Sequence, residues 1–289
     1  MTASATSGVR EIVLLTLGWE VLPKSVSVEG AGDDVVLVEP VPGVLLRCDG
    51  GWMLVDTGFN TALIRDAALA RRFHGEHPVV RSVLPGPGEP IEEALDAVGI
   101  DVRDITAVAL SHLHVDHAGG LKLFSGRAPV HAQRAELAYG MDRSADAERH
   151  AIFRVDFDDP AHDWRLADGD AEIAPGVTAV LTAGHTPGHQ SFVVDLDPSV
   201  GGGGLVLACD AADLTENIEE EVAVGGRIEA GPEVSVAAIR RLKALASERG
   251  YLLVPGHDPQ VWPALTAEVA ERFGRTPHLP VLPEGVVVP

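Results

Sequence analysis

The sequence predicts an α/β fold with two β-sheets inside and helices outside. Short apolar runs typical of strands are followed by amphipathic runs typical of helices, and a second set of strands and helices then repeats that order. No linker and no internal repeat divides the 289 residues. A chain of this length can bury a sizeable core, so we expect one domain over residues 1–275 and a Pro-rich C-terminal tail over residues 276–289.

The first half of the chain begins with strands. Short β-rich runs interrupted by Gly and Pro predict an antiparallel meander over residues 11–22, 34–39, 43–48 and 52–56. Helices are expected over residues 61–72 and 90–98, the second with Pro90 in its first turn and Gly99 at its end. The apolar run 105–110 predicts another strand.

The second half returns to strands before it ends in helices. A helix is expected over residues 132–139, followed by an irregular polar stretch over residues 141–163. Strands are predicted over residues 177–181, 191–196, 205–209 and 251–254. An amphipathic helix over residues 232–249 ends at Gly250, and a last helix places Leu265, Val269 and Phe273 on one face.

Charge and composition restrict the classes of partner. The formal net charge is -21, with 43 acidic against 22 basic residues, and this argues against nucleic acid or an anionic membrane as a partner. Two cysteines are too few for a disulfide framework. No apolar run approaches the roughly 18 residues that a membrane span requires, and the run 12–17 lies between Glu11 and Glu20, unlike a signal peptide. We therefore expect a soluble cytoplasmic protein.

The stretch Ser-His-Leu-His-Val-Asp-His-Ala-Gly-Gly at residues 111–120 carries the densest set of metal-binding side chains. It follows the apolar run 105–110, where a buried strand is expected to end. Neutral imidazoles and carboxylates are donors that suit zinc. His112 and His114 occupy alternate positions of an extended segment and can bind one ion together, while Asp116 and His117 turn towards a second.

Three further donors follow strand-like runs later in the chain: His185, Asp210 and His257. With the four of residues 111–120 they make seven, which is more than one four-coordinate ion needs. Strand ends of a layered fold meet at one edge, so we expect the seven to form one site. His189 is expected to support the site from outside the donors. Single histidines elsewhere are more often plain surface or core residues, and no role is assigned to His74, His77, His131, His150, His162 and His278.

These motifs resemble the metallo-β-lactamase superfamily. The resemblance rests on residues 111–120, on the earlier Leu-Val-Asp-Thr-Gly at residues 54–58, on Gly-His-Thr-Pro-Gly-His-Gln-Ser at residues 184–191, on Asp210 and on Gly-His at residues 256–257. Within the superfamily, residues 182–192, 210–217, 241–243 and 255–258 are most similar to the N-acyl homoserine lactonases, which are quorum-quenching lactonases. The resemblance implies an αβ/βα four-layer sandwich, in which two mixed sheets are flanked by helices.

The resemblance also implies a dinuclear zinc centre. His112, His114 and His185 would bind one ion, Asp116, His117 and His257 the other, and Asp210 would bridge them. Asp56 would hold the ligand loop through hydrogen bonds. Other divalent metals such as Fe, Mn or Co suit the same donors.

The implied activity is opening of a lactone ring, of an N-acyl homoserine lactone or a related lactone, by attack of a metal-bridging hydroxide on the carbonyl. Asp116 and Asp210 are the residues expected to carry the proton to the leaving alkoxide. The partner would be a small-molecule lactone or ester. Lactonases of this kind are commonly dimers, so the resemblance also allows a homodimer.

One position departs from the lactonase pattern. Those enzymes typically carry a tyrosine three residues after the bridging aspartate, and here that position is Asp213. An ionised carboxylate cannot donate a hydrogen bond to an oxyanion, so either the metals suffice, or Tyr139 or another donor takes this part, or the substrate differs. Asp213 is also a candidate cap for a helix that starts at Thr215.

Other functions remain open on the sequence alone. The fold also serves ester, thioester and phosphodiester hydrolases, whereas true β-lactamases supply a cysteine to the second metal. Cys209 is the nearby candidate, and strand alternation predicts that it points away from Asp210. A non-enzymatic function, in which the protein only binds metal, is a further alternative. Structural zinc sites, however, are usually rich in cysteine. The loops over residues 73–90 and 141–163 are expected to form the substrate pocket.

Overall fold

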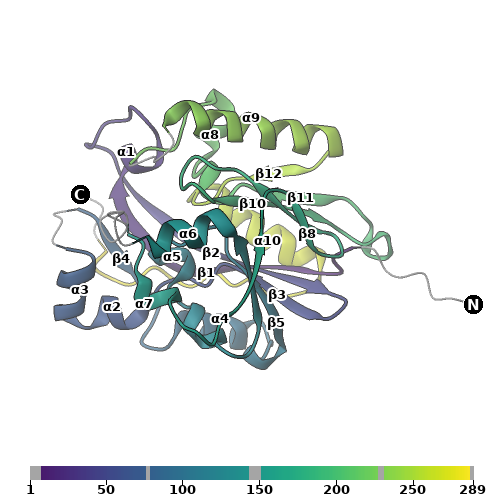
Figure 1. The fold of residues 1–289 in the computed structure, drawn as a ribbon, viewed down its shortest axis with the longest axis horizontal. Coiled ribbons are helices and arrows are strands. Elements are labelled where there is room, and N and C mark those ends of the chain that lie inside the picture. Colours follow the sequence, from purple (N-terminus) through teal and green to yellow (C-terminus); the bar gives the residue numbers. More distant parts are fainter. Residues whose placement is uncertain (1–7, 76–78, 143–150, 227–230, 287–289) are drawn as a thin grey trace, which may run out of the picture.

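Two β-sheets pack face to face in the computed structural model, with helices on the outer face of each (Figure 1). The structure describes residues 8–75, 79–142, 151–226 and 231–286. Within these residues, none of the helices combines the length and the apolar character needed to cross a membrane.

The larger sheet has seven strands. Their order across the sheet is β4 (Arg81–Val83), β1 (Ile12–Pro23), β2 (Val36–Cys48), β3 (Gly51–Val55), β5 (Ile105–Ala109), β6 (Pro129–Gln133) and β7 (Asp163–Ala167). Strands β1, β2 and β3 form an antiparallel meander, β4 pairs antiparallel with β1, and β3, β5, β6 and β7 run parallel. The sheet is therefore mixed, and β3 and β5 end at the same edge.

The smaller sheet has five strands. Their order is β12 (Leu252–Val254), β11 (Gly204–Leu207), β10 (Gln190–Asp195), β9 (Val177–Leu181) and β8 (Ala171–Ala174). Strand β10 is antiparallel to both β9 and β11, and β12 is parallel to β11. Strands β9, β11 and β12 consequently run in one direction and end at one edge.

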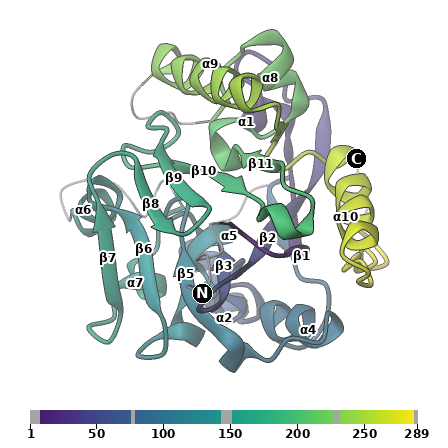
Figure 2. The ribbon, with the colours of Figure 1, turned by 90° about the vertical axis from the view of Figure 1, so that its right-hand side faces the viewer.

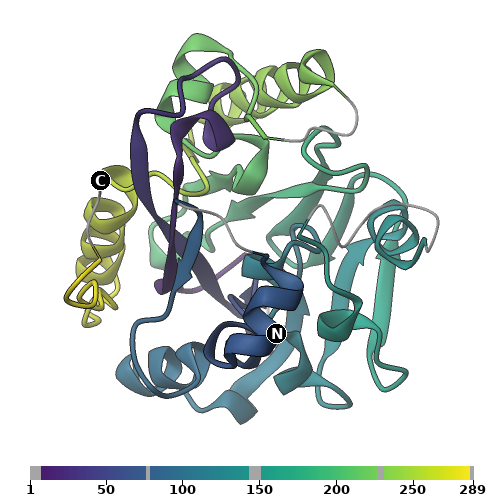
Figure 3. The ribbon, with the colours of Figure 1, turned by 90° about the vertical axis from the view of Figure 1, so that its left-hand side faces the viewer.

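Most helices lie on two sides of the sheet pair, whereas α10 packs beside β1 and adds Trp262, Leu265 and Val269 to the apolar cluster between the sheets. Figures 2 and 3 show α8 and α9 beside the five-stranded sheet and α2, α3 and α4 at the opposite end of the molecule. The bounds are α1 Lys24–Ser27, α2 Thr61–Arg65, α3 Ala67–Phe73, α4 Pro90–Ala97, α5 Val115–Ala118, α6 Arg134–Met141, α7 Arg154–Phe157, α8 Thr215–Glu220, α9 Pro232–Arg249 and α10 Val261–Arg272. Single 3₁₀ turns cover Val102–Asp104, Leu121–Phe124, Pro198–Val200 and Cys209–Ala211.

Alternation along the strands divides the core into three apolar layers. In β1, Leu15 packs towards the outer helices of the larger sheet, whereas Leu14 faces the other sheet. In β10, Phe192 lies between the sheets and Val193 packs against α9. Because side chains of a strand point alternately to its two faces, both sheets are covered on both sides. The predicted four-layer sandwich is confirmed.

Several predicted elements have the expected bounds, and others differ. Helix α9 spans Pro232–Arg249 and ends at Gly250 in the left-handed conformation. The helix predicted over residues 61–72 is two helices, because the Asp66 side chain accepts hydrogen bonds from Ala68 N and Leu69 N and starts a new helix there. Residues 36–39 and 43–48 belong to the single strand β2, which starts two residues later than predicted.

The short strands β4, β6, β7 and β8 were not predicted. Ala132, expected in a helix, belongs to β6, and the helix starts two residues later. These strands have between three and five residues, too few for a clear alternating pattern. Residues 276–286 of the predicted tail contain neither helix nor strand, and His278 Nδ1 accepts a hydrogen bond from Thr16 N at 3.3 Å.

Candidate metal centre

The candidate donors lie where strands of both sheets end. Strand β5 leads into residues 111–117, and β3 leads into Asp56. In the other sheet, β9 precedes His185, β11 precedes Asp210 and β12 precedes His257. The structure thus brings together at one edge seven donors that span residues 112–257.

The local structure of residues 111–120 depends on its two glycines. His114 lies at the start of α5, which carries Asp116 and His117. A Cβ atom on Gly119 would clash with the backbone nitrogen of Asn60, and one on Gly120 would clash with the carbonyl oxygen of Thr57. The glycines therefore let the helix pack directly against the chain that follows β3.

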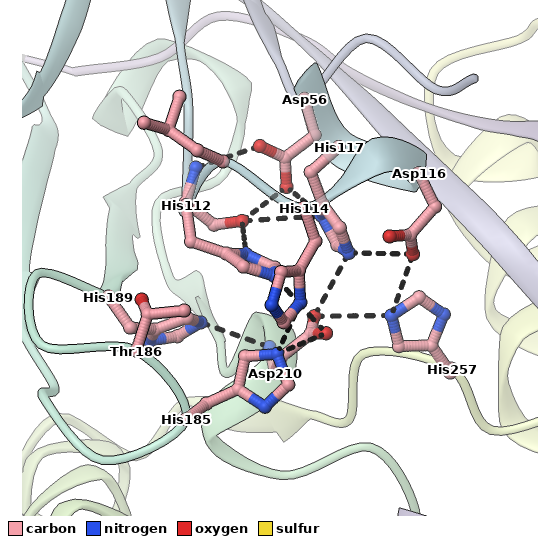
Figure 4. Close-up of polar contacts among 12 residues, drawn as sticks. Asp56, His112, His114, Asp116, His117, His185, Thr186, His189, Asp210 and His257 are labelled. Carbon is pink, nitrogen blue, oxygen red and sulfur yellow. Dashed lines mark hydrogen bonds and ion pairs between the residues drawn. The ribbon is translucent and has the colours of Figure 1, made fainter. Parts of the chain in front are cut away.

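The donors form two groups that share one carboxylate (Figure 4). The first group is His112, His114, His185 and Asp210, and the second is Asp116, His117, Asp210 and His257. Within each group the ligand atoms lie within 4.8 Å of one another.

Asp210 presents a different oxygen to each group. Its Oδ2 lies 3.6 Å from His112 Nε2 and 3.4 Å from His185 Nε2. Its Oδ1 lies 3.2 Å from His117 Nε2 and 3.1 Å from His257 Nε2. In Figure 4 the carboxylate stands between the two sets of imidazoles. This is the arrangement by which one carboxylate can bridge two cations.

The protonation of the histidines fits metal binding. His117 Nδ1 donates to Asp56 Oδ2 at 2.9 Å, and His257 Nδ1 donates to the carbonyl oxygen of Pro40 at 2.9 Å. With the ring proton held there, the Nε2 lone pair of each neutral imidazole faces the centre. The Nε2 atoms of His112 and His117 are buried and have no hydrogen-bond partner. A divalent ion would supply the partner that these nitrogens lack.

Electrostatics differ between the two groups. Burial lowers the pKa of His112 and of His185 well below the usual value, which favours the neutral form that binds a metal. Burial also acts on His117, but the carboxylates of Asp116 and Asp210 outweigh it and raise the pKa of His117 well above its usual value. The second group therefore attracts positive charge, and a metal ion can take the place of the proton.

Asp56 and Ser111 form a hydrogen-bonded support beneath the donors. Ser111 N donates to Asp56 Oδ1 and Ser111 Oγ to Asp56 Oδ2, both at 2.8 Å. His112 Nδ1 lies 2.9 Å from Ser111 Oγ, so one carboxylate orients a histidine of each group. Asp56 has a φ of 58° and Cys209 a φ of 48°, and both are sparsely populated conformations for residues other than glycine.

His189 contacts the backbone of Asp210 on the side away from the donor groups. Its Nε2 accepts a hydrogen bond from Asp210 N at 3.1 Å, and its Nδ1 lies 2.9 Å from Thr182 Oγ1. The side chain is fully buried. His189 therefore lies outside the two donor groups and contacts the backbone of Asp210, and its supporting role stays a prediction.

Glu136 is a supporting residue that sequence reasoning missed. It is fully buried on α6, where its carboxylate accepts hydrogen bonds from Leu113 N at 3.0 Å, Thr186 Oγ1 at 2.6 Å and Gly188 N at 3.0 Å. These bonds tie the loop that carries His114 to the loop that carries His185. Burial raises the pKa of Glu136 to about 7. A lone acidic residue in a helical run gives no sequence signal for such a contact.

A cavity of about 630 Å³ opens beside the two groups. Donors from both groups line this cavity, together with residues of β1, of β2 and of the segment before α8. The lining residues are Glu20, Leu22, Val26, Ser27, Glu39, Val80, His114, Val115, Asp116, Ala151, His185, Asp210, Asp213, Gly225, Gly226 and His257. Of the two loops expected to form the pocket, residues 76–78 and 143–150 lie outside the described residues, and Val80 and Ala151 reach the cavity.

Asp213 and Tyr139 occupy different environments. Asp213 lines the cavity and is 6% exposed. It does not cap α8, because Asn217 Oδ1 accepts from Leu214 N and Asp258 Oδ2 accepts from Thr215 N in its place. Tyr139 is absent from the described lining residues and packs, partly buried, against the core of the larger sheet.

Cys209 lies in a 3₁₀ turn and not on a strand, because β11 ends at Leu207. The strand predicted over residues 205–209 is thus too long by two residues, and strand alternation does not set the direction of the Cys209 side chain. Neither donor group found among the described residues contains a cysteine.

Comparison with known proteins agrees with this geometry. A sequence model of the Metallo-beta-lactamase superfamily matches residues 36–257. The N-acyl homoserine lactonase of Bacillus thuringiensis is 33% identical over 221 residues, which cover 76% of this chain and 81% of that protein. The N-acyl homoserine lactonase AttM of Azorhizobium caulinodans is 31% identical over 242 residues, covering 82% and 88%.

Solved structures are similar along most of their length. A variant of B. thuringiensis AiiA with N-decanoyl-L-homoserine bound at the active site has a TM-score of 0.75 and 28% identity, covering 88% of this chain and 95% of that one. The same scores and coverage apply to an N-acyl homoserine lactone hydrolase that holds the product N-hexanoyl-L-homoserine at its catalytic metal centre.

Proposed function

Because the chain belongs to the metallo-β-lactamase superfamily and is a hydrolase, we propose that it opens the ring of a lactone at a dinuclear zinc centre. An N-acyl homoserine lactone or a related lactone is the proposed substrate, since the relatives that cover three quarters of the chain are named N-acyl homoserine lactonases. The observation that carries the proposal is the position of Asp210, which offers one oxygen to each of two donor groups beside an open cavity.

The proposed roles follow from the two groups. His112, His114 and His185 would hold one ion, and Asp116, His117 and His257 the other, with Asp210 between them. Two divalent ions bound there would polarise the ester carbonyl and lower the pKa of a coordinated water to about 7. Nitrogen and carboxylate donors without sulfur suit zinc, and they also accept Fe, Mn or Co.

Residues of the chain would orient the reactants and move the proton. Asp116 and Asp210 both line the cavity, so either carboxylate can take a proton and deliver it to the alkoxide that leaves when the ring opens. Asp56 and His189 would keep the histidines and Asp210 in place, because their bonds fix ring orientation and the backbone of residue 210. The product would be a ring-opened hydroxy acid.

Metal analysis combined with a substrate panel tests this function. The purified protein should contain two metal ions per chain and hydrolyse N-acyl homoserine lactones faster than aryl esters, thioesters and phosphodiesters. His114→Ala should lower lactone hydrolysis at least about 100-fold, while His131→Ala, on β6 and outside both groups, should retain it. Preference for a thioester or phosphodiester would assign a different hydrolase activity. A metal-loaded protein that hydrolyses none of the panel would support a non-catalytic metal-binding role.

A further inference from the structure

The cavity beside the donor groups has an acidic wall that the proposed metal centre does not use. Glu20, Glu39 and Asp213 line it, and none of the three belongs to either donor group. Among the described residues that line the cavity there is no lysine or arginine. The wall therefore presents three carboxyl groups and no matching cation from the described lining.

Two of these carboxyl groups face each other across neighbouring strands. Glu20 on β1 pairs directly with Glu39 on β2. Like charges in such a position destabilise a sheet, and burial increases the effect. Glu39 is 2% exposed, and Ser27 Oγ donates to its Oε1 at 2.6 Å. Sheet stability does not explain this pair.

A β-bulge turns Glu20 towards the cavity. The register between β1 and β2 shifts between Thr16 and Gly18, so the alternation of side chains changes there. Beyond the shift, Trp19 lines a surface pocket together with Thr16, while Glu20 lines the cavity. Bulges often redirect a side chain next to an active site, and this one supplies the wall with a carboxyl group.

Asp213 is the strongest sign of a missing partner. Asp213 is only 6% exposed, and its Oδ1 is buried without a hydrogen-bond partner. A buried carboxyl oxygen that lacks a hydrogen-bond partner is energetically unfavourable. The helix start next to it is capped by Asp258 and Asn217, so Asp213 has no structural task there.

The two proposed metal ions would not neutralise the wall. Neither Glu20 nor Glu39 belongs to a donor group, and burial raises the pKa of Glu20 to about 8 and of Glu39 to about 7, so a cation bound beside them would take the place of protons that these carboxyl groups otherwise hold. Ionised carboxylates only accept hydrogen bonds. The group that satisfies them best brings both N–H donors and positive charge, as an ammonium group does. A neutral hydroxyl group would donate but leave the charge uncompensated.

Resting on the lactone hydrolysis proposed above, we infer that the preferred substrate carries a cationic amino group, which Glu20, Glu39 and Asp213 bind while the ester carbonyl lies at the donor groups. An acyl chain with an amino group fits this wall better than an aliphatic chain. The same wall repels the carboxylate that ring opening produces, and this repulsion favours product release.

Matched pairs of lactones test the inference. N-(4-aminobutanoyl)- and N-(6-aminohexanoyl)-homoserine lactone are compared with the N-butanoyl and N-hexanoyl compounds at the same pH and ionic strength. We expect kcat/KM to be at least about tenfold higher for an amino compound, mainly through a lower KM, with a preference that weakens as salt is added. Glu20→Gln and Asp213→Asn should each lower the ratio between the members of a pair, whereas Glu92→Gln, exposed on α4, should not.

Binding separates this inference from the proposed activity. The corresponding lactams, which lack the ester, are titrated into the metal-loaded protein by calorimetry. If no lactone is hydrolysed but the amino lactam binds more tightly, the lactonase proposal fails and the cation site stands. Tighter binding and faster turnover of the alkyl compounds would overturn the cation site and leave the lactonase proposal intact. A preference for amino compounds that survives both acidic-wall variants would also overturn it.

Discussion

Replacing Asp56 by Asn tests how the chain orients the proposed second ion. The carboxylate accepts hydrogen bonds from Ser111 N and Ser111 Oγ at 2.8 Å and from His117 Nδ1 at 2.9 Å. Asn fills the same space and readily adopts the left-handed conformation that Asp56 has at φ 58°. The change therefore leaves the backbone conformation unaltered. It places an amide N–H₂ or a neutral oxygen opposite His117.

The expected effect is confined mainly to one ion. Loss of a partner that orients a ligating histidine typically lowers metal affinity roughly 10- to 100-fold, or about 1.4–2.7 kcal/mol. Asp56 contacts His117 of the second group directly, but it reaches His112 of the first group only through Ser111. We expect the affinity for the ion bound by Asp116, His117 and His257 to fall by this factor. The affinity for the other ion should fall less.

Competition with a chromophoric zinc chelator measures both affinities. The loaded wild-type protein and the Asp56→Asn variant are titrated, and the metal that remains is counted by mass spectrometry. Asp96→Asn, exposed on α4, is the matched control and should behave as wild type. If both ions are released as in wild type, or if the affinity for both falls equally, Asp56 does not act mainly through His117.

Three further changes test the roles of Asp156, Asn217 and Gly119. Burial raises the pKa of Asp156 to about 7, so native-state stability is lost as pH rises from about 4 to 7, and Asp156→Asn should gain melting temperature over wild type across that range. Equal differences at pH 5 and pH 7 would contradict this. Asn217→Ala removes bonds to Leu214 N and to the carbonyl oxygens of Ser27, Val222 and Ala223, so chemical denaturation should show a loss of roughly 2–4 kcal/mol. Gly119→Ala should displace α5 and lower metal content, whereas Gly50→Ala, whose Cβ meets open space, should not.

The donors could be predicted because they share a local pattern. Each follows an apolar run that forms a strand, as Asp210 follows β11 and His257 follows β12. Strands that run in one direction end at one edge, so the pattern predicts proximity without any knowledge of long-range contacts. The four-layer fold could be predicted in the same way, since the order of strands and helices and the motifs both indicate it.

The supports and the acidic wall could not be predicted, because they depend on contacts between distant segments. Glu136 reaches the loop after β9 from α6, and nothing near residue 136 indicates this. Glu20 and Glu39 interrupt apolar runs, which is a weak signal of a special site. Their common direction depends on the bulge beside Gly18, and a period of two cannot anticipate such a shift.

The spread of the donors along the chain has a consequence for how the protein matures during synthesis. The first group is complete once Asp210 has been made, but the second also requires His257, which follows the long helix α9 and the edge strand β12. In a nascent chain that ends before residue 257, the first group is the one complete set of donors. It consists of His112, His114, His185 and Asp210. If two ions bind as proposed, only the first group could hold one before residue 257 has been made.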